Sequence, residues 1–256
     1  CCRSARVHLI FDGTSFPKKG DKTVGVKRQY CGTLGKIENC TVSVHLGYFR
    51  DGFHAPLDAD VYIPQEWMDD PARRVEAGVP KELEFRTKPQ IATDILRRSI
   101  EAGVQLQWLT ADEEYGRSAT FRQEVADTGL WYVVEVPSSM KGWTVRPETG
   151  ARGLPLPEER ELREVSALWK RGGPSWEMYR VKDTEKGPVV WAVRQTIFYP
   201  NDEGRPGAAL RLLVAGNMET GELKYFYSNA PMEIALSKVV CVAFSRSHIE
   251  QLFEEG

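Results

Sequence analysis

The chain has 256 residues, of which 41% are hydrophobic and 27% are charged. These values are typical of a folded globular protein and exclude a disordered chain or a small disulfide-stapled scaffold. The 34 Lys and Arg residues oppose 36 Asp and Glu, so the formal net charge of -2 indicates no global attraction to nucleic acid. No apolar run approaches the roughly 18 residues of a membrane helix, and we expect a cytoplasmic protein without a membrane partner.

The N-terminal part of the chain predicts a meander of three strands. Residues 6–11 form a short apolar strand that ends at Asp12, and residues 24–30 and 40–48 continue with alternating polar and apolar side chains. Residues 50–87 are rich in Asp, Pro and Arg and are expected to be irregular. A carboxylate is therefore predicted at the end of the first strand.

Helices and strands are expected to alternate in the next part of the chain. Apolar residues recur at helical spacing in 91–102, residues 104–109 form a buried strand that leads to Asp112, and 118–128 form a helix that opens with a serine cap. Residues 131–136 complete the series as a strand. This order is typical of an α/β fold with some parallel strand pairing.

The C-terminal half begins with an irregular stretch. Turn-forming residues are frequent in 138–222, where short β-like runs at 189–198 and 210–215 predict a β-rich insertion with long loops. After it, residues 224–228 predict a strand, and residues 233–254 have the periodicity of a helix.

Cysteine and histidine give no site of their own. The five cysteines are odd in number and lack the paired C-x-x-C spacing of a zinc ribbon, so we expect reduced thiols. The four histidines lack any recognisable ligand spacing and are expected to be structural or surface residues.

Three carboxylates have the context of a metal site. Asp12 and Asp112 follow predicted strands, and Glu250 lies on the predicted C-terminal helix. Two Mg²⁺ ions held roughly 4 Å apart by such oxygens can activate water at a phosphodiester and stabilise the leaving oxygen. If the three groups share these ions, they should lie within about 4 to 8 Å of one another, and without metal their like charges should disfavour ionisation of the closest pair.

Each of these residues also has a simpler interpretation. An Asp at the end of a strand is more often a turn former or a helix cap. Arg246 lies four residues before Glu250 and could pair with it across one turn of a surface helix. The Glu250 carboxylate would then point to solvent, far from both Asp residues.

A basic segment follows the first strand. Residues 17–36 hold six Lys or Arg against one Asp. Such a segment beside acidic metal ligands suits a phosphate-backbone substrate, because its cations offset the repulsion between the polymer and the carboxylates. A solvated basic hairpin explains the same composition equally well.

Three motifs carry a resemblance to a known family. Residues 11–36 contain FDGTSFPKKG, VGVKRQYCG and LGK, residues 111–116 read ADEEYG, and YSNAP at 227–231 precedes RSHIEQLF at 246–253. In this order they resemble the DDE transposases of bacterial insertion sequences, and more narrowly the IS701-like branch of the insertion-sequence-four group. The resemblance covers nearly the whole chain.

The fold implied by this resemblance is α/β, with a ribonuclease H-like mixed sheet flanked by helices. Residues 1–137 would form the first part of the catalytic core, 138–222 a β-rich insertion between the second Asp and the Glu, and 223–256 the C-terminal strand and helix of the core. Ala243 stands where the family's third motif has Tyr, and Ser247 where Trp is common. The chain is expected to be a catalytic fragment.

The function implied is metal-dependent DNA cleavage at transposon ends, followed by strand transfer into target DNA. Asp12, Asp112 and Glu250 would hold two Mg²⁺ ions, for which Mn²⁺ can substitute. The partners implied are double-stranded DNA and a second copy of the chain in a homodimer, at the bacterial nucleoid. The residues expected to contact DNA are Lys18, Lys19, Lys27, Arg28, Lys36 and Arg246.

Two other functions stay open. One is a non-catalytic DNA-binding or regulatory protein derived from a transposase, against which the three carboxylates count. The other is a ribonuclease H-like nuclease that only hydrolyses DNA. A strand-transfer assay with pre-cleaved ends separates the second from a transposase.

Overall fold

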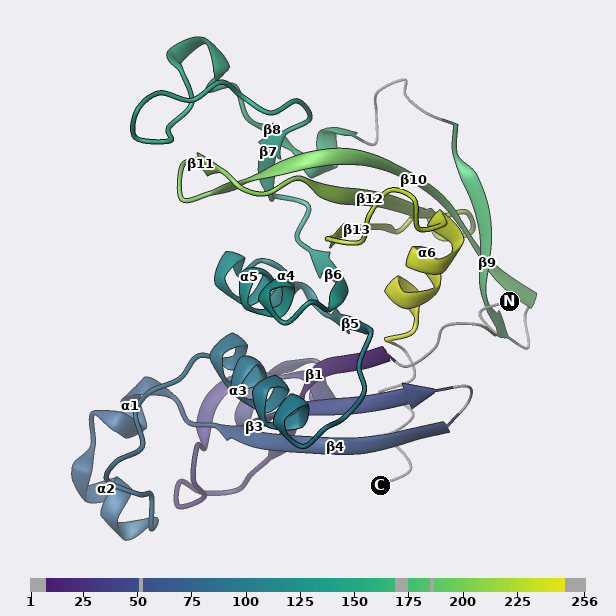
Figure 1. Ribbon diagram of the computed structural model, residues 1–256. Coiled ribbons are helices and arrows are strands. Elements are labelled where there is room, and N and C mark those ends of the chain that lie inside the picture. Colours follow the sequence, from purple (N-terminus) through teal and green to yellow (C-terminus); the bar gives the residue numbers. More distant parts are fainter. Residues whose placement is uncertain (1–7, 51–52, 169–174, 185–186, 247–256) are drawn as a thin grey trace.

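The computed structural model describes residues 8–50, 53–168, 175–184 and 187–246 (Figure 1). In this part of the chain, strand pairing joins thirteen strands into one sheet. They are β1 (His8–Pro17), β2 (Lys27–Cys31), β3 (Lys36–Arg50), β4 (Phe53–Tyr62), β5 (Trp108–Ala111), β6 (Trp131–Val136), β7 (Lys141–Trp143), β8 (Arg163–Glu164), β9 (Glu177–Thr184), β10 (Gly187–Asp202), β11 (Arg205–Pro206), β12 (Leu210–Asn217) and β13 (Leu223–Ser228).

The sheet is mixed and mostly antiparallel. Its strand order is β2-β3-β1-β5-β6-β13-β12-β10-β7-β8, while β4 also pairs with β3, and β9 and β11 pair with β10. Among the described strands, only the β1–β5 and β5–β6 pairs are parallel. The α/β class is therefore confirmed, with a larger antiparallel share than the sequence predicts.

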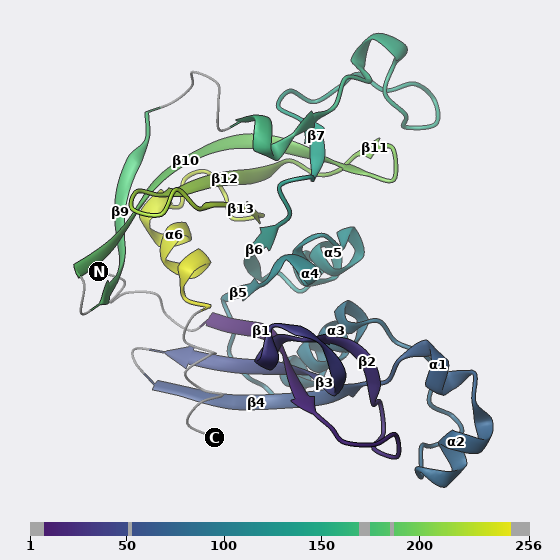
Figure 2. The ribbon, with the colours of Figure 1, turned by 180° about the vertical axis from the view of Figure 1, so that it is seen from behind.

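The α-helices of the described residues are short, apart from α3, which has 14 residues. They are α1 (Gln65–Met68), α2 (Pro71–Glu76), α3 (Lys88–Glu101), α4 (Glu113–Gly116), α5 (Ala119–Asp127) and α6 (Leu236–Phe244). None of them has the length and apolar character needed to cross a bilayer. Figure 2 shows α1 and α2 at the same end of the molecule as β2.

The predicted meander is present, but its first strand is longer than expected. β1 pairs with β3 over its whole length, from His8 opposite Phe49 to Pro17 opposite Cys40. Asp12 therefore lies inside a strand, and the prediction that the strand ends there is wrong. The Gly-Thr-Ser sequence after Asp12 has turn composition, yet its backbone groups find extended partners on β3.

The prediction of an irregular segment at 50–87 is wrong for β4. This strand pairs with β3 across a register shift after Leu46. Its polar residues conceal it in the sequence because their partners lie elsewhere in the chain: Asp58 pairs with Arg98 of α3 at 2.9 Å, and Asp60 pairs at 2.9 Å with Arg86, which precedes α3. The aspartates of β4 are thus neutralised by one arginine of α3 and one arginine of the segment that leads into it.

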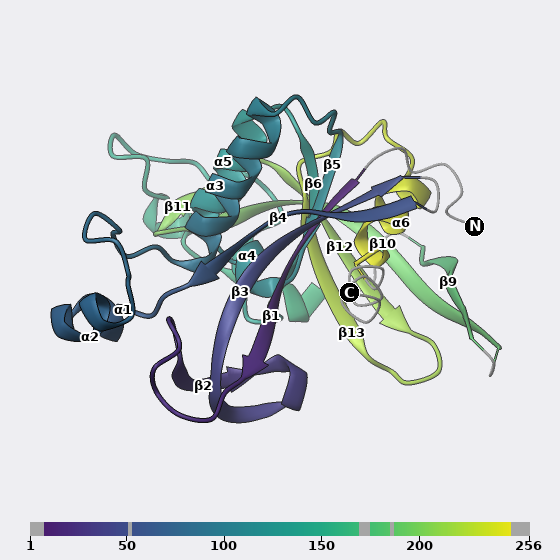
Figure 3. The same cartoon turned by 90° about the horizontal axis from the view of Figure 1, so that it is seen from below.

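The hydrophobic core has two layers, one on each side of the sheet. Alternate strand residues such as Leu109 and Val134 pack with α3 and α5, while Trp108 and Val133 pack with α6 on the other side. Figures 1 and 3 show α6 separated from α3 and α5 by the strands. This alternation decides which face each polar residue of the central strands presents.

The C-terminal helix is shorter than predicted. α6 begins after Ala235 and ends at Phe244, with Ser245 as its C-cap, so the expectation of one helix over 233–254 is wrong. Arg246 follows this end directly. Residues 247–256, including Glu250, lie outside the described residues.

The region 138–222 contains strands β7 to β12 and no α-helix in its described part. Its two longest antiparallel partners, β10 and β12, continue the sheet from β13. Of the cysteines, Cys31 and Cys40 are buried and free. Cys241 is disulfide-bonded, so the expectation of reduced thiols is wrong for this residue.

Candidate active site

Asp12 and Asp112 occupy equivalent positions along the neighbouring parallel segments that contain β1 and β5. The pairing of β1 with β5 ends at Phe11 opposite Ala111, and each Asp is the next residue of its segment. Phe11 and Ala111 point into the core layer of α3 and α5. The alternation of side chains therefore directs Asp12 to the opposite side of the sheet, where α6 lies.

One guanidinium group joins the two carboxylates. Nη1 of Arg246 lies 3.7 Å from Oδ2 of Asp12 and 3.7 Å from Oδ2 of Asp112, so the two oxygens are at most twice this distance apart. The Oδ1 atoms accept hydrogen bonds from backbone N–H groups, of Gly13 at 2.8 Å and of Glu114 at 2.8 Å. The backbone thus holds one oxygen of each carboxylate, and the other oxygen faces the shared cation.

Asp112 also has the simpler role that the sequence allows. It is the N-cap of α4, because its Oδ1 accepts the N–H of Glu114. The cap uses only this oxygen and leaves Oδ2 directed at Arg246. Capping and participation in a site are therefore compatible at this residue.

Glu135 is a third carboxylate at this level, and the motifs do not single it out. β5 and β6 run in parallel with Ala111 opposite Val134, so Glu135 follows the last pair as Asp112 does. Val134 belongs to the core layer of α3, which directs Glu135 to the α6 side. The sequence signal for it was one charged residue inside an apolar strand.

Two cations contact Glu135. Its Oε2 lies 3.8 Å from Nη2 of Arg246, and its two carboxylate oxygens lie 3.1 and 3.3 Å from Nζ of Lys224. The side chains of Asp12, Asp112 and Glu135 are only 16%, 26% and 19% exposed. Three part-buried carboxylates therefore lie together with the cationic groups of Arg246 and Lys224.

Burial dominates the electrostatics of the site. It raises the pKa of the Asp112 carboxyl above its ordinary value, while the Arg246 charge acts to lower it. Burial also raises the pKa of Tyr115 well above its usual value, and the charges of Asp112, Glu114 and Asp12 add to this effect. The buried Tyr115 hydroxyl has no hydrogen-bond partner among the described residues.

The predicted third ligand cannot be placed, because Glu250 lies outside the described residues. Within the described part of the chain, no group of three or more His, Cys, Asp or Glu side chains has the geometry of a metal centre. The arrangement instead shows two aspartates drawn to one arginine.

Arg246 lies at the carboxylates, and the other five predicted DNA contacts divide into two groups. Lys27 pairs with Glu66, and Lys36 pairs with Glu38 at 3.4 Å. The remaining three, Lys18, Lys19 and Arg28, are exposed and have no ion pair with another described residue. Next to Arg28 on the same face of β2, Tyr30 is 64% exposed.

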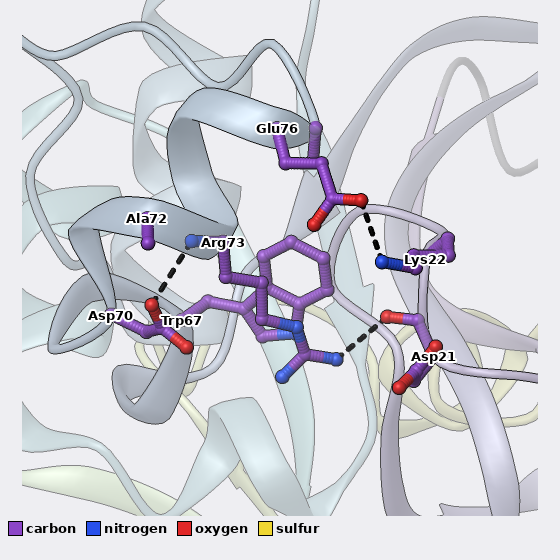
Figure 4. A pocket seen from close by; sticks show the side chains of 8 residues that line it. Asp21, Lys22, Trp67, Asp70, Ala72, Arg73 and Glu76 are labelled. Atoms are coloured by element: carbon purple, nitrogen blue, oxygen red, sulfur yellow. Dashed lines mark hydrogen bonds and ion pairs between the residues drawn. The ribbon is translucent and has the colours of Figure 1, made fainter.

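The loop after β1 is fastened to α1 and α2 around a pocket of about 460 Å³ (Figure 4). Nε1 of Trp67 donates to the carbonyl oxygen of Val26 at 2.9 Å, and Arg73 stacks on the Trp67 ring. Lys22 pairs with Glu76 at 2.6 Å. Neither Asp12 nor Asp112 lines this pocket, and its contacts hold the loop that carries Lys18 and Lys19.

Comparison with known proteins defines the class. The family described as DDE superfamily endonuclease matches residues 1–188, and the chain belongs to this family. Over 132 residues it is 36% identical to a protein of Microchaete diplosiphon named as the probable transposase for insertion sequence element IS701. The matched part is 51% of this chain and 32% of that protein, so the chain spans about a third of that relative's length.

Proposed function

We propose that this chain is the catalytic part of a transposase that cleaves DNA at transposon ends and transfers the cleaved strand into target DNA. The observation that carries the proposal is the convergence of Asp12 and Asp112 on one cation, at the point where the parallel pairing of β1 with β5 ends. Membership of the DDE endonuclease family and similarity to a probable transposase support the same reaction class.

The proposed core is ribonuclease H-like. The antiparallel strands β4, β3 and β1, followed by β5 and β6 parallel to β1, support this assignment. In this proposal residues 1–137 and 223–256 form the core, and 138–222 form the β-rich insertion. The partners are double-stranded DNA and a second copy of the chain, and the place of action is the bacterial nucleoid.

Divalent metal ions fit the donor set of the site. Endonucleases of the DDE superfamily generally use divalent metals. Asp12 and Asp112 offer hard oxygen ligands that already share a positive partner, and together with Glu250 they would hold Mg²⁺ or Mn²⁺. When bound, two such ions supply an activated water and stabilise the leaving oxygen of a phosphodiester.

The residues of the chain prepare this site. The backbone N–H groups that hold the two Oδ1 atoms orient the carboxylates before any ligand arrives. The positive charge of Arg246 offsets their repulsion and offers a contact for a DNA phosphate. Fixed donors and acceptors of this kind avoid reorganisation during the reaction.

β1 would connect the site to the DNA-binding segment. From Asp12 to Lys18 the strand rises by about 20 Å at roughly 3.3 Å per residue. A duplex with its cleaved phosphate at Asp12 would reach Lys18 after about six base pairs, at roughly 3.4 Å per pair. Lys18, Lys19 and Arg28 are therefore the proposed backbone contacts, while Lys27 and Lys36 contribute less because each has an acidic partner.

The test is a cleavage and strand-transfer assay with DNA that carries the transposon ends, in Mg²⁺ and in EDTA. Replacing Asp12 or Asp112 with Asn, or Glu250 with Gln, should lower cleavage on the order of a hundredfold or more and leave DNA binding intact. Glu113→Gln is the matched control, because this exposed neighbour of Asp112 forms its one ion pair among the described residues with Arg117. Near-normal cleavage by Asp12→Asn or Asp112→Asn would remove that residue from the mechanism.

Pre-cleaved ends decide between the remaining functions. A transposase joins them to target DNA in the presence of the metal. Cleavage without joining would indicate a hydrolytic nuclease, and DNA binding without either reaction would indicate a regulatory protein.

A further inference from the structure

A single guanidinium contacts one carboxylate on β1, one directly after β5 and one on β6. Nη1 of Arg246 faces Asp12 and Asp112, and Nη2 faces Glu135. The two ends of this group therefore have different partners: one faces the proposed metal ligands, and the other faces a residue outside the DDE motif.

We propose that Glu135 is a positioning residue of the site, which holds Arg246 against Asp12 and Asp112. The inference rests on the proposed function, because it assigns the two aspartates as metal ligands. In this arrangement Arg246 occupies the two Oδ2 atoms in the metal-free protein and competes with a divalent cation for them. Glu135 acts through Arg246 and sets how strongly it competes.

The position of Glu135 is itself held on two sides. It lies opposite Phe226 on β13, so Lys224 is its diagonal neighbour on the same face and binds both of its oxygens. On the other side, Gly116 of α4 approaches its backbone so closely that a Cβ there would lie 1.9 Å from the Glu135 carbonyl oxygen. Asp112 caps this same α4, so the helix links the backbone positions of Asp112 and Glu135.

Competition between Arg246 and the metal predicts the direction in which each substitution changes the affinity for Mn²⁺. Arg246→Gln removes the competing cation and should tighten the binding of Mn²⁺. Glu135→Asp keeps the negative charge but withdraws the carboxylate from Arg246, so it should also tighten Mn²⁺ binding when Arg246 is present. In the Arg246→Gln background the same substitution has nothing to release and should leave the affinity unchanged.

The experiment is a double-mutant cycle on Mn²⁺ affinity, measured by electron paramagnetic resonance without DNA. We expect the Glu135→Asp effect on Kd to differ between the two backgrounds by at least about threefold, as for residues within one ion-pair network. Glu135→Gln is a second probe, because it removes the negative charge of the side chain and also releases Arg246. The loss of charge should weaken Mn²⁺ binding in both backgrounds, and the release of Arg246 should make this weakening smaller when Arg246 is present. Urea unfolding in EDTA checks that each variant is folded.

Glu222→Gln is the matched control. Glu222 also lies near Lys224, at 3.8 Å, but no contact with Arg246 occurs among the described residues. Its effect on Kd should be the same in both backgrounds. Equal effects of the Glu135 substitutions in both backgrounds, or the same coupling for Glu222, would overturn the inference. If the unsubstituted protein binds no Mn²⁺, the proposed function fails first, and the inference fails with it.

Discussion

Arg122 reaches from α5 to Asp202 at the end of β10, a residue far away in the chain. The arginine is buried, with 3% exposure, and its Nη2 donates to Oδ1 of Asp202 at 2.9 Å. Its Nη1 donates to the carbonyl oxygen of Gly116 at 2.6 Å. This pair fastens the helices that follow Asp112 to the strands of the region 138–222.

Replacing Arg122 with Met should therefore destabilise the fold by about 3 to 5 kcal/mol, because it leaves a part-buried carboxylate without its partner. Urea unfolding measures the loss. Burial raises the pKa of Asp202, so protonation relieves the unpaired charge and the loss should shrink at low pH. The double variant Arg122→Met with Asp202→Asn should recover part of the stability, and no recovery would contradict the ion-pair explanation.

Gly116→Ala should destabilise the protein by roughly 1 to 3 kcal/mol, as overpacking does in other tightly packed cores. The new Cβ would meet the Glu135 carbonyl oxygen at 1.9 Å, which forces α4 away from β6. Gly150→Ala is the control, because its Cβ would meet only Leu156 at 3.8 Å. Thermal unfolding compares the two, and equal stability of both variants would show that α4 moves freely.

Asp112→Asn should stabilise the metal-free protein at neutral pH. Burial raises the pKa of the Asp112 carboxyl in the folded state above its ordinary value, so the folded state binds more protons than the unfolded state at pH values between the ordinary and the raised pKa. Stability then falls as pH rises through this window, and the Asn variant escapes the loss. Urea unfolding in EDTA across this pH range should show a difference that grows with pH. A variant less stable than the unsubstituted protein at neutral pH would contradict the assignment.

Neutralising Lys18, Lys19 or Arg28 should each lower the slope of log K against log salt by about 0.9, the value for one lost phosphate contact on duplex DNA. The loss should be similar for unrelated DNA sequences, since backbone contacts carry no sequence information. Lys27→Gln and Lys36→Gln should change the slope less, because both side chains have acidic partners. Equal slopes for all five variants would mean that the ion pairs open in the complex. An unchanged slope for the first three would identify the segment as an ordinary solvated hairpin.

The sequence by itself determined the local elements around the site. The helix opened by Ser118 and the strand Trp131–Val136 are confirmed, because a cap and an apolar run are local signals. The ordered motifs also determined the family, which the comparisons confirm. The roles of Asp12, Asp112 and Glu250 stay predictions.

Only the tertiary structure decided how far elements extend when distant partners stabilise them. β1 continues through a turn-like sequence because β3 supplies its hydrogen bonds, and β4 tolerates its aspartates because Arg86 and Arg98 pair with them. The helical pattern of 233–254 predicts a helix across Ser245, where α6 has already ended.

The grouping of Asp12, Asp112 and Glu135 also belongs to the tertiary structure. Each is the residue after the last pair in the β1, β5 and β6 register, and Arg246 reaches all three from the end of α6. Local periodicity sets the face of the sheet on which a side chain lies, but not which residue of the neighbouring strand lies beside it. This register is set by hydrogen bonding between segments distant in the chain. For this reason the sequence alone shows Glu135 only as one charged residue in an apolar strand.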